Sequence, residues 1–209
     1  MRFDLDQVDT SVAYKLLAAT VVPRPIAWVV TQGPAGVNAA PFSFFNVMGS
    51  APPTVAIGIL GDPVRGWKDT ARNILETGQF AINLVPESLV QAMNMTAADA
   101  PLGVDELALA GLETAPCTHI APPRIAQSPV SFECVTHSTV ETGPFQMVVI
   151  GRVLAVHLED RFVKDAARGH VHTEALDLVA RGFGARYIRT QDTFDLERPT
   201  WAGLQAGKG

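Results

Sequence analysis

Residues 38–46 read NAAPFSFFN, a run in which three phenylalanines stand between two asparagines. The flanking segments, AWVV before it and TVAIGIL after it, are rich in the aliphatic and β-branched residues that favour strands. We therefore expect residues 26–31 and 37–45 to form a hairpin around the loop at 32–36. Alternation along the second strand would place Phe42, Phe44 and Asn46 on one side, with Ser43 and Phe45 on the other.

Carboxamides buried in a sheet need hydrogen-bond partners, and two kinds of partner fit this run equally well. The partners are either other protein groups or a flat heteroaromatic ligand with donors and acceptors along its edge. A flavin ring is such a ligand, because it combines a large apolar face with a polar pyrimidine edge.

Farther from this run, strands with Gly and Pro turns alternate with a few short helices, without the regular strand–helix repeat of a parallel sheet. The pattern predicts a mainly antiparallel β-barrel with added helices. Further strands are expected at 54–60, 79–85, 130–140 and 145–158. Helices are expected at 11–17, with Asp9 or Thr10 as N-cap, and at 68–78, 86–95, 105–110 and 173–180.

The composition is that of a single globular domain: 209 residues, 47% hydrophobic and 18% charged, with a formal net charge of -5. The acidic balance argues against nucleic-acid binding, and no apolar run approaches the roughly 20 residues of a membrane span. The N-terminus lacks the pattern of a secretion signal, so we expect a soluble, cytoplasmic protein. In that compartment Cys117 and Cys134 are expected to be buried free thiols, with a disulfide as the alternative.

Lys68-Asp69-Thr70 opens a predicted helix, where unpaired backbone N–H groups and a lysine would suit a phosphate. An acid such as Asp69 disfavours an anion unless it turns away, for example to cap the helix. On spacing alone, an ordinary capped surface helix is the stronger interpretation. His170 and His172 would share one face of a strand, but without an evident third ligand a solvated loop is favoured over a metal site.

A series of short motifs, in order along residues 23–156, resembles the flavin reductase-like family, which includes flavoredoxins and the reductase components of two-component monooxygenases. The series comprises PRPIAWV at 23–29, NAAPFSFFN at 38–46, PP at 52–53, KDT at 68–70 with Asn73, FAIN at 80–83, EC at 133–134 after SP at 128–129, and VIGRV at 149–153.

The resemblance implies an FMN-binding split β-barrel with Greek-key-like antiparallel strands, formed by a single domain over 1–209 with a peripheral C-terminal extension from about 159. It also implies a homodimer with flavin near the subunit interface, and FMN rather than FAD. Its implied roles are phosphate binding by Lys68 and Thr70, contacts with the ring and ribityl chain by Ser43, Phe44 and Asn46, and further contributions to the same site by Thr31, Asn38 and Asn73. Trp28 is expected in the core and Arg24 beside an acid.

The resemblance implies an oxidoreductase in which NADH or NADPH reduces bound FMN, and electrons pass to a flavin, a metal or a protein such as a monooxygenase. No catalytic side chain is assigned. Smaller members carry a Gly-Asp-His segment associated with nicotinamide use, whereas residues 142–146 here read TGPFQ. This departure argues against efficient use of NAD(P)H and favours the flavoredoxin-like branch. Two alternatives to the reductase are an FMN-binding electron carrier not reduced by NAD(P)H and a non-catalytic module that binds another ligand in the barrel.

Overall fold

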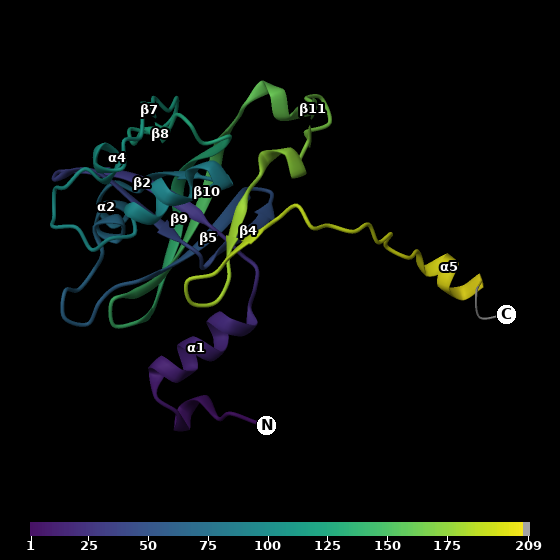
Figure 1. Ribbon diagram of the computed structural model, residues 1–209, viewed down its shortest axis with the longest axis horizontal. Helices are drawn as coiled ribbons and strands as arrows, with labels where there is room; N and C mark the ends of the chain where they lie inside the picture. The colour runs from purple at the N-terminus through teal and green to yellow at the C-terminus, as the bar shows by residue number, and fades with distance from the viewer. Residues whose placement is uncertain (207–209) are drawn as a thin grey trace.

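The computed structural model describes residues 1–206. Its main element is a seven-stranded antiparallel sheet with the strand order β3-β2-β6-β9-β10-β5-β4. The outermost strands, β3 and β4, follow one another directly in the chain, so the sheet curls into a barrel (Figure 1). These strands are β2 (Ala27–Gly33), β3 (Gly36–Phe42), β4 (Phe45–Ser50), β5 (Pro53–Leu60), β6 (Gln79–Asn83), β9 (Val130–Gly143) and β10 (Gln146–Leu158).

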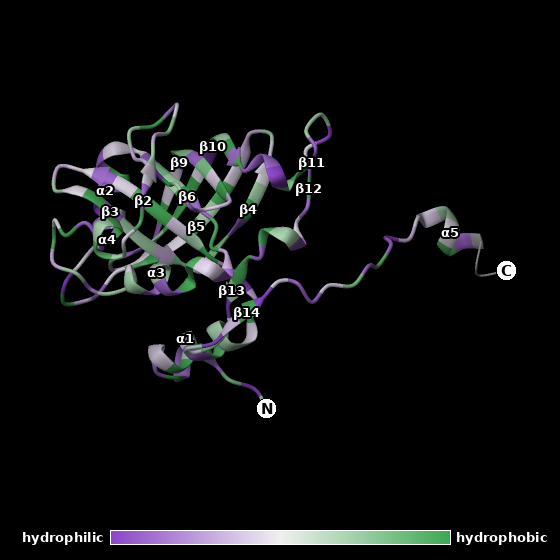
Figure 2. Cartoon of the chain, turned by 45° about the horizontal axis from the view of Figure 1, so that its top comes forward, coloured by the Kyte–Doolittle hydropathy of each residue, from purple (hydrophilic) through white to green (hydrophobic). Residues whose placement is uncertain are grey.

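The alternation of β2 divides the core into two layers. Ala27 and Val29 point into the barrel with the inward residues of the other strands, and helix α2 (Asp69–Thr77) covers this cluster with Ala71 and Ile74. Trp28 and Val30 point outward and are covered by α3 (Val90–Met95), α4 (Glu106–Leu109) and the segment 120–125. Both faces of β2 are therefore buried, which explains why its sequence is apolar throughout. Figure 2 shows the hydrophobic colouring gathered on the barrel strands.

The remaining elements lie around the barrel. Strands β13 (Val179–Arg181) and β14 (Tyr187–Arg189) form a small sheet with β1 (Arg24–Pro25). Helix α1 (Thr10–Thr20) lies outside the barrel, and the segment after β14 extends away from it to α5 (Trp201–Ala206) (Figure 1). Within residues 1–206, every helix is too short or too polar to cross a bilayer. The other elements of the described residues are short: β7 (Thr114–Ala115), β8 (Arg124–Ile125), β11 (Val163–Asp165), β12 (His170–Val171) and 3-10 turns at Leu5–Gln7, Glu87–Leu89, Asp160–Phe162 and Glu174–Leu176.

Several sequence expectations are confirmed. The mainly antiparallel barrel is present, and Asp9 caps α1 by accepting a hydrogen bond from Ser11 N at 2.7 Å. Gly78 ends α2 with φ 67°, a conformation that glycine adopts without steric cost. Trp28 is fully buried in the core. Both cysteines are free thiols; Cys134 is buried as expected, whereas Cys117 is only partly buried, and this burial raises its pKa to about 11.

The expectation of one continuous strand over 37–45 is wrong. Strand β3 ends at Phe42 and β4 begins at Phe45, so the two halves of NAAPFSFFN lie on opposite edges of the curled sheet. The expected alternation, with Phe42, Phe44 and Asn46 on one side of a single strand, is therefore wrong as well. Phe42 is 8% exposed inside the barrel, whereas Phe44 is 36% exposed.

The helix expected over 173–180 is also wrong. Only Glu174–Leu176 forms a 3-10 turn, which ends where Asp177 takes a left-handed φ of 51°. The chain then enters β13, where Ala180 pairs with Pro25 and is buried. Pairing with β1 therefore overrides the local helical pattern. That the segment from about 159 is a peripheral extension of a single domain stays a prediction.

Candidate functional site

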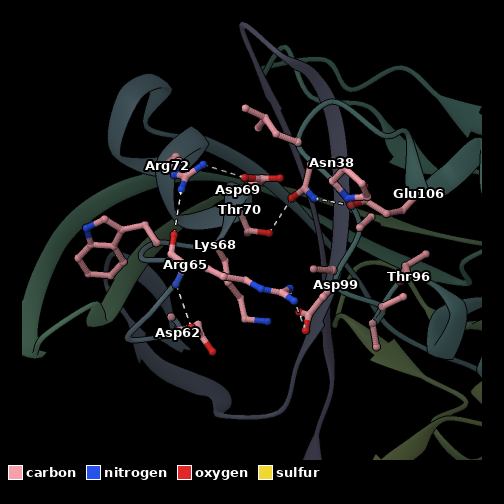
Figure 3. Close-up of a pocket in the computed structure, with 18 of the residues that line it drawn as sticks. Asn38, Asp62, Arg65, Lys68, Asp69, Thr70, Arg72, Thr96, Asp99 and Glu106 are labelled. Atoms are coloured by element: carbon pink, nitrogen blue, oxygen red, sulfur yellow. Dashed lines mark hydrogen bonds and ion pairs between the residues drawn. The ribbon is translucent and has the colours of Figure 1, made fainter.

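A cleft of about 680 Å³ opens where β3, the start of α2 and the segment 96–102 meet. Its volume lies within the range typical of small-molecule and cofactor pockets. The lining combines apolar side chains with many polar and charged ones, as Figure 3 shows. Its polar and charged residues are Asn38, Asp62, Arg65, Lys68, Asp69, Thr70, Arg72, Thr96, Asp99 and Glu106.

The N-terminus of α2 borders this cleft, which Lys68, Asp69 and Thr70 line. Lys68 occupies the N-cap position in an extended conformation, without a side-chain cap. The N–H groups of the first turn have no partner within a helix and carry partial positive charge. Together with the lysine, this end of α2 has the chemistry of an anion site.

Ion pairs neutralise the other cations of the cleft. Arg65 pairs with Asp99 at 3.2 Å and Arg72 pairs with Asp69 at 3.3 Å. The Asp69 carboxylate thus faces Arg72 of the same helix and not the place where an anion would bind beside Lys68. It does not cap the helix. Within the described part of the chain, Lys68 forms no ion pair, which leaves its charge available to a ligand.

Asn38 is the centre of a hydrogen-bond network behind the cleft. Its Oδ1 accepts a hydrogen bond from Thr70 Oγ1 at 2.7 Å, and its Nδ2 donates to Glu106 Oε1 at 3.0 Å. The other oxygen of Glu106 accepts from Ala39 N at 3.0 Å. The Thr70 hydroxyl hydrogen is therefore used inside the protein, so an anion at this position would meet the backbone N–H groups and Lys68.

The network continues into the interior through β2. Asn73 Nδ2 donates to Thr31 Oγ1 at 3.0 Å, and Thr31 Oγ1 lies 3.4 Å from Asn38 Oδ1. Thr31 is fully buried, and Thr70 is 1% exposed. The structure thus brings Thr31, Asn38, Thr70 and Asn73 together, with Lys68 at the rim, although the buried members face one another more than the open space.

A second hollow of about 470 Å³ adjoins the first, and both are bordered by Pro41, Phe42 and Ala97. Ser43 lies here, 3.4 Å from Arg24 Nε. The expectation that Arg24 pairs with an acid is wrong. Its guanidinium donates to the carbonyl oxygens of Ala18, Val21 and Gly182, and so joins the end of α1 to the C-terminal segment.

Phe44 and Asn46 lie outside the first cleft. The Phe44 ring packs against Tyr14, with ring centroids 6.1 Å apart, and Arg24 lies over it at 5.9 Å. Asn46 is exposed, and its Oδ1 accepts a hydrogen bond from Val47 N at 2.8 Å. The break between β3 and β4 therefore separates these residues from Asn38 and α2.

The comparisons with known proteins agree with this geometry. The family model described as the flavin reductase like domain matches residues 19–175. The chain belongs to the flavin reductase-like family. It is 45% identical over 210 residues to an uncharacterized protein of Deinococcus radiodurans, an alignment that covers 97% of this chain and 92% of that one.

Two solved structures are similar in both fold and sequence. One is nitrilotriacetate monooxygenase component B from Bacillus cereus, with a TM-score of 0.88 and 30% identity, covering 94% of this chain and 98% of that one. The other is the 2-nitrobenzoate 2-nitroreductase NbaA of Pseudomonas fluorescens, with a TM-score of 0.87 and 30% identity, covering 96% and 98%. The fold is therefore the split barrel of flavin reductases, and the family supports flavin-related oxidoreductase activity.

Sequence reasoning missed Glu106 in this flavin reductase-like protein. Glu106 is 6% exposed and holds both Asn38 and the backbone of β3. It lies in the four-residue helix α4, far along the chain from its partners. The one available signal was its position directly after Asp105, a typical N-cap, which predicts a helix start and says nothing of the contact with Asn38.

Gly33 gives a test of the buried network. A Cβ atom at Gly33 would lie 2.1 Å from Asn73 Oδ1, so Gly33→Ala must displace the Asn73 amide and break its bond to Thr31. We expect a loss of about 1–2 kcal/mol in the free energy of unfolding, measured by urea denaturation. At Gly143 a Cβ would lie 3.8 Å from its nearest neighbour, so Gly143→Ala should stay within about 0.5 kcal/mol of the parent. Equal stability of the two variants would contradict the role of the network.

Proposed function

We propose that this protein is an FMN-dependent oxidoreductase that accepts reducing equivalents from NADH or NADPH and passes electrons to a flavin, a metal or a protein acceptor. Bound flavin supplies the hydride and electron transfer. The contribution of the protein is to bind the cofactor, orient it and shield it. We name no side chain as an acid or a base.

The observation that carries the proposal is the N-terminus of α2 in a chain of this family. A lysine outside any ion pair of the described residues and the first backbone N–H groups of α2, at the rim of a cofactor-sized cleft, fit the terminal phosphate of FMN. In this assignment Lys68 and the first turn of α2 bind the phosphate. Thr31, Asn38, Thr70 and Asn73 hold β2, β3 and α2 in register beneath it through their mutual hydrogen bonds.

The isoalloxazine ring would extend along β3, past Pro41 and Phe42, toward the hollow bordered by Ser43. Phe44 and Asn46 remain proposed flavin contacts, and their contribution depends on a second copy of the chain closing this end. Exposed apolar side chains support such a homodimer: Tyr14 and Leu17 on α1, and Val47 and Met48 on β4.

An anaerobic titration tests the function. The purified protein is loaded with FMN, and NADH or NADPH is added while the flavin absorbance is followed. We expect bleaching by at least one nicotinamide and rapid reoxidation by an added acceptor, such as free flavin. A protein that fails to retain FMN would contradict the cofactor assignment. Retained FMN that neither nicotinamide bleaches would contradict the reductase assignment alone.

The second candidate function is an FMN-binding electron carrier reduced by a protein partner. The β9–β10 turn favours it, because this turn holds Phe145 and no histidine where smaller members carry Gly-Asp-His. Phe145 lies beside the cleft: its carbonyl accepts from Gly61 N at 2.7 Å, and its ring packs edge-on against Trp67, with centroids 5.8 Å apart. Under this alternative, dithionite bleaches the flavin whereas both nicotinamides leave it oxidised.

A further inference from the structure

Three metal-ligating side chains converge on the outer wall of the barrel, outside the proposed flavin site. The ligand atoms of Cys117, Glu133 and His157 all lie within 4.8 Å of one another. None of these residues lines the cleft or the hollow beside it. Within residues 1–206, no other set of three Cys, His, Asp or Glu side chains brings its ligand atoms this close together. His170 and His172 do not belong to the set.

Strand pairing brings Glu133 and His157 together. Glu133 lies opposite Ala155 in the β9–β10 ladder, and His157 lies opposite Ser131. Since residues two apart share a face of a strand, Glu133 and His157 are diagonal neighbours on the same face. The next residue, Cys134, faces the barrel core, so only Glu133 of this pair is directed toward the loop 116–119.

The carboxylate of Glu133 is fixed before any ligand arrives. It is fully buried and accepts hydrogen bonds from Thr118 N at 2.8 Å and His119 N at 2.6 Å. His157 Nε2 lies 2.6 Å from Glu133 Oε1. Hydrogen bonds of this kind hold ligating carboxylates in metalloproteins and fix their orientation. Cys117 enters from the same loop and is partly exposed, which provides a path from solvent.

We propose that Cys117, Glu133 and His157 bind a Zn²⁺ ion. One sulfur, one nitrogen and one carboxylate oxygen form a donor set suited to zinc and unlike the all-oxygen sets preferred by Mg²⁺ and Ca²⁺. Three protein ligands leave the fourth tetrahedral position to water, on the side where Cys117 is accessible.

When the metal binds, Cys117 Sγ and His157 Nε2 each give up the hydrogen that they carry in the metal-free protein. The Cys117 thiol loses its proton to solvent as the sulfur–zinc bond forms. The Nε2 atom of His157 faces a carboxylate oxygen and so carries a hydrogen there; this hydrogen leaves Nε2, to solvent or by transfer to Nδ1, and Nε2 then coordinates. Two ligand atoms each about 2.0 Å from one zinc ion are roughly 3.3 Å apart in a tetrahedron. His157 must therefore withdraw from Glu133 by a small movement that its partly exposed position allows.

Cobalt titration of the full-length, FMN-loaded protein tests the site. Co²⁺ takes the place of Zn²⁺ and reports its ligands through d–d bands at wavelengths longer than those at which oxidised flavin absorbs. We expect saturable binding of one Co²⁺ per chain, intense tetrahedral-type bands, and displacement of Co²⁺ by Zn²⁺. Cys117→Ser should weaken Zn²⁺ binding at least about 100-fold, since changes to outer-shell partners alone cost about 10–100-fold.

Matched variants separate this site from other thiols and imidazoles. Cys134→Ala removes the other cysteine and His170→Gln removes a remote histidine, so both should bind Co²⁺ like the parent, whereas His157→Gln should not. Absence of tetrahedral bands in the parent, or bands that persist in Cys117→Ser, would overturn the proposal and leave the cluster as a hydrogen-bonded anchor for the loop 116–119. The bands do not depend on flavin chemistry, so this test can fail or succeed independently of the proposed function.

Discussion

Trp28→Ala is expected to lower the free energy of unfolding by about 3–5 kcal/mol, the usual cost of removing a large aromatic side chain from a packed core. Trp28 is fully buried at the centre of the outer core layer, against Met93 and Leu107. Its Nε1 donates to Thr96 Oγ1 at 2.8 Å, and Thr96 borders the cleft. The substitution therefore removes both the packing and the hydrogen bond that fix the segment following α3. Urea denaturation at one protein concentration, without added flavin, measures the effect.

Trp28→Phe is the matched control. It keeps an aromatic ring in the core but loses the N–H donor. Thr96 Oγ1 still donates to Met93 O at 2.8 Å, so its hydroxyl hydrogen keeps a partner. We expect a loss of roughly 1–2 kcal/mol from the missing hydrogen bond and the smaller ring. If Trp28→Ala were no more destabilising than Trp28→Phe, packing of the Trp28 ring against α3 and α4 would not contribute to the stability of the outer core layer.

Lys68→Glu is expected to weaken FMN binding about 10- to 100-fold at low ionic strength. The substitution removes a charge-assisted contact and places a second negative charge beside the phosphate. The lower part of the range allows for the exposure of Lys68, and the effect should shrink as salt is added, because exposed charges are screened. Fluorescence quenching of FMN, titrated with protein at two salt concentrations, measures it.

The surroundings of Lys68 make it the cation to test. Arg65 and Arg72 border the same cleft, but Asp99 and Asp69 respectively neutralise them. Lys164→Glu provides the control, since Lys164 is an exposed lysine on β11, far from the cleft in sequence and absent from its lining. It changes the net charge equally and should leave FMN affinity within about twofold of the parent, because distant exposed charges are screened.

The parts of the site that sequence reasoning predicted are those fixed by neighbouring elements. Register in the β2–β3 hairpin places Thr31 opposite Asn38. Helix α2 then packs on β2 and brings Thr70 and Asn73 to the same polar network. Local signals also predicted the limits of α2, because Gly78 ends a helix at little conformational cost.

The parts that sequence reasoning missed depend on how the sheet closes. Residues 37–45 have strand propensity throughout, and only the curling of the barrel separates β3 from β4 at Ser43. Arg24 was expected beside an acid, but its guanidinium donates to Ser43 Oγ and to three backbone carbonyl groups, and backbone partners carry no sequence signature. Glu106 meets Asn38 from a four-residue helix distant along the chain, and short helices offer no periodicity from which to infer a facing residue.

The most direct test of the flavin assignment compares FMN with riboflavin, which is the same molecule without the phosphate. Dissociation constants of both ligands are measured for the parent protein and for Lys68→Glu. The account predicts that the parent binds FMN more tightly than riboflavin, and that Lys68→Glu removes this preference while leaving riboflavin affinity unchanged. Equal affinity of the parent for the two ligands, or equal weakening of both in the variant, would contradict a phosphate site at the N-terminus of α2.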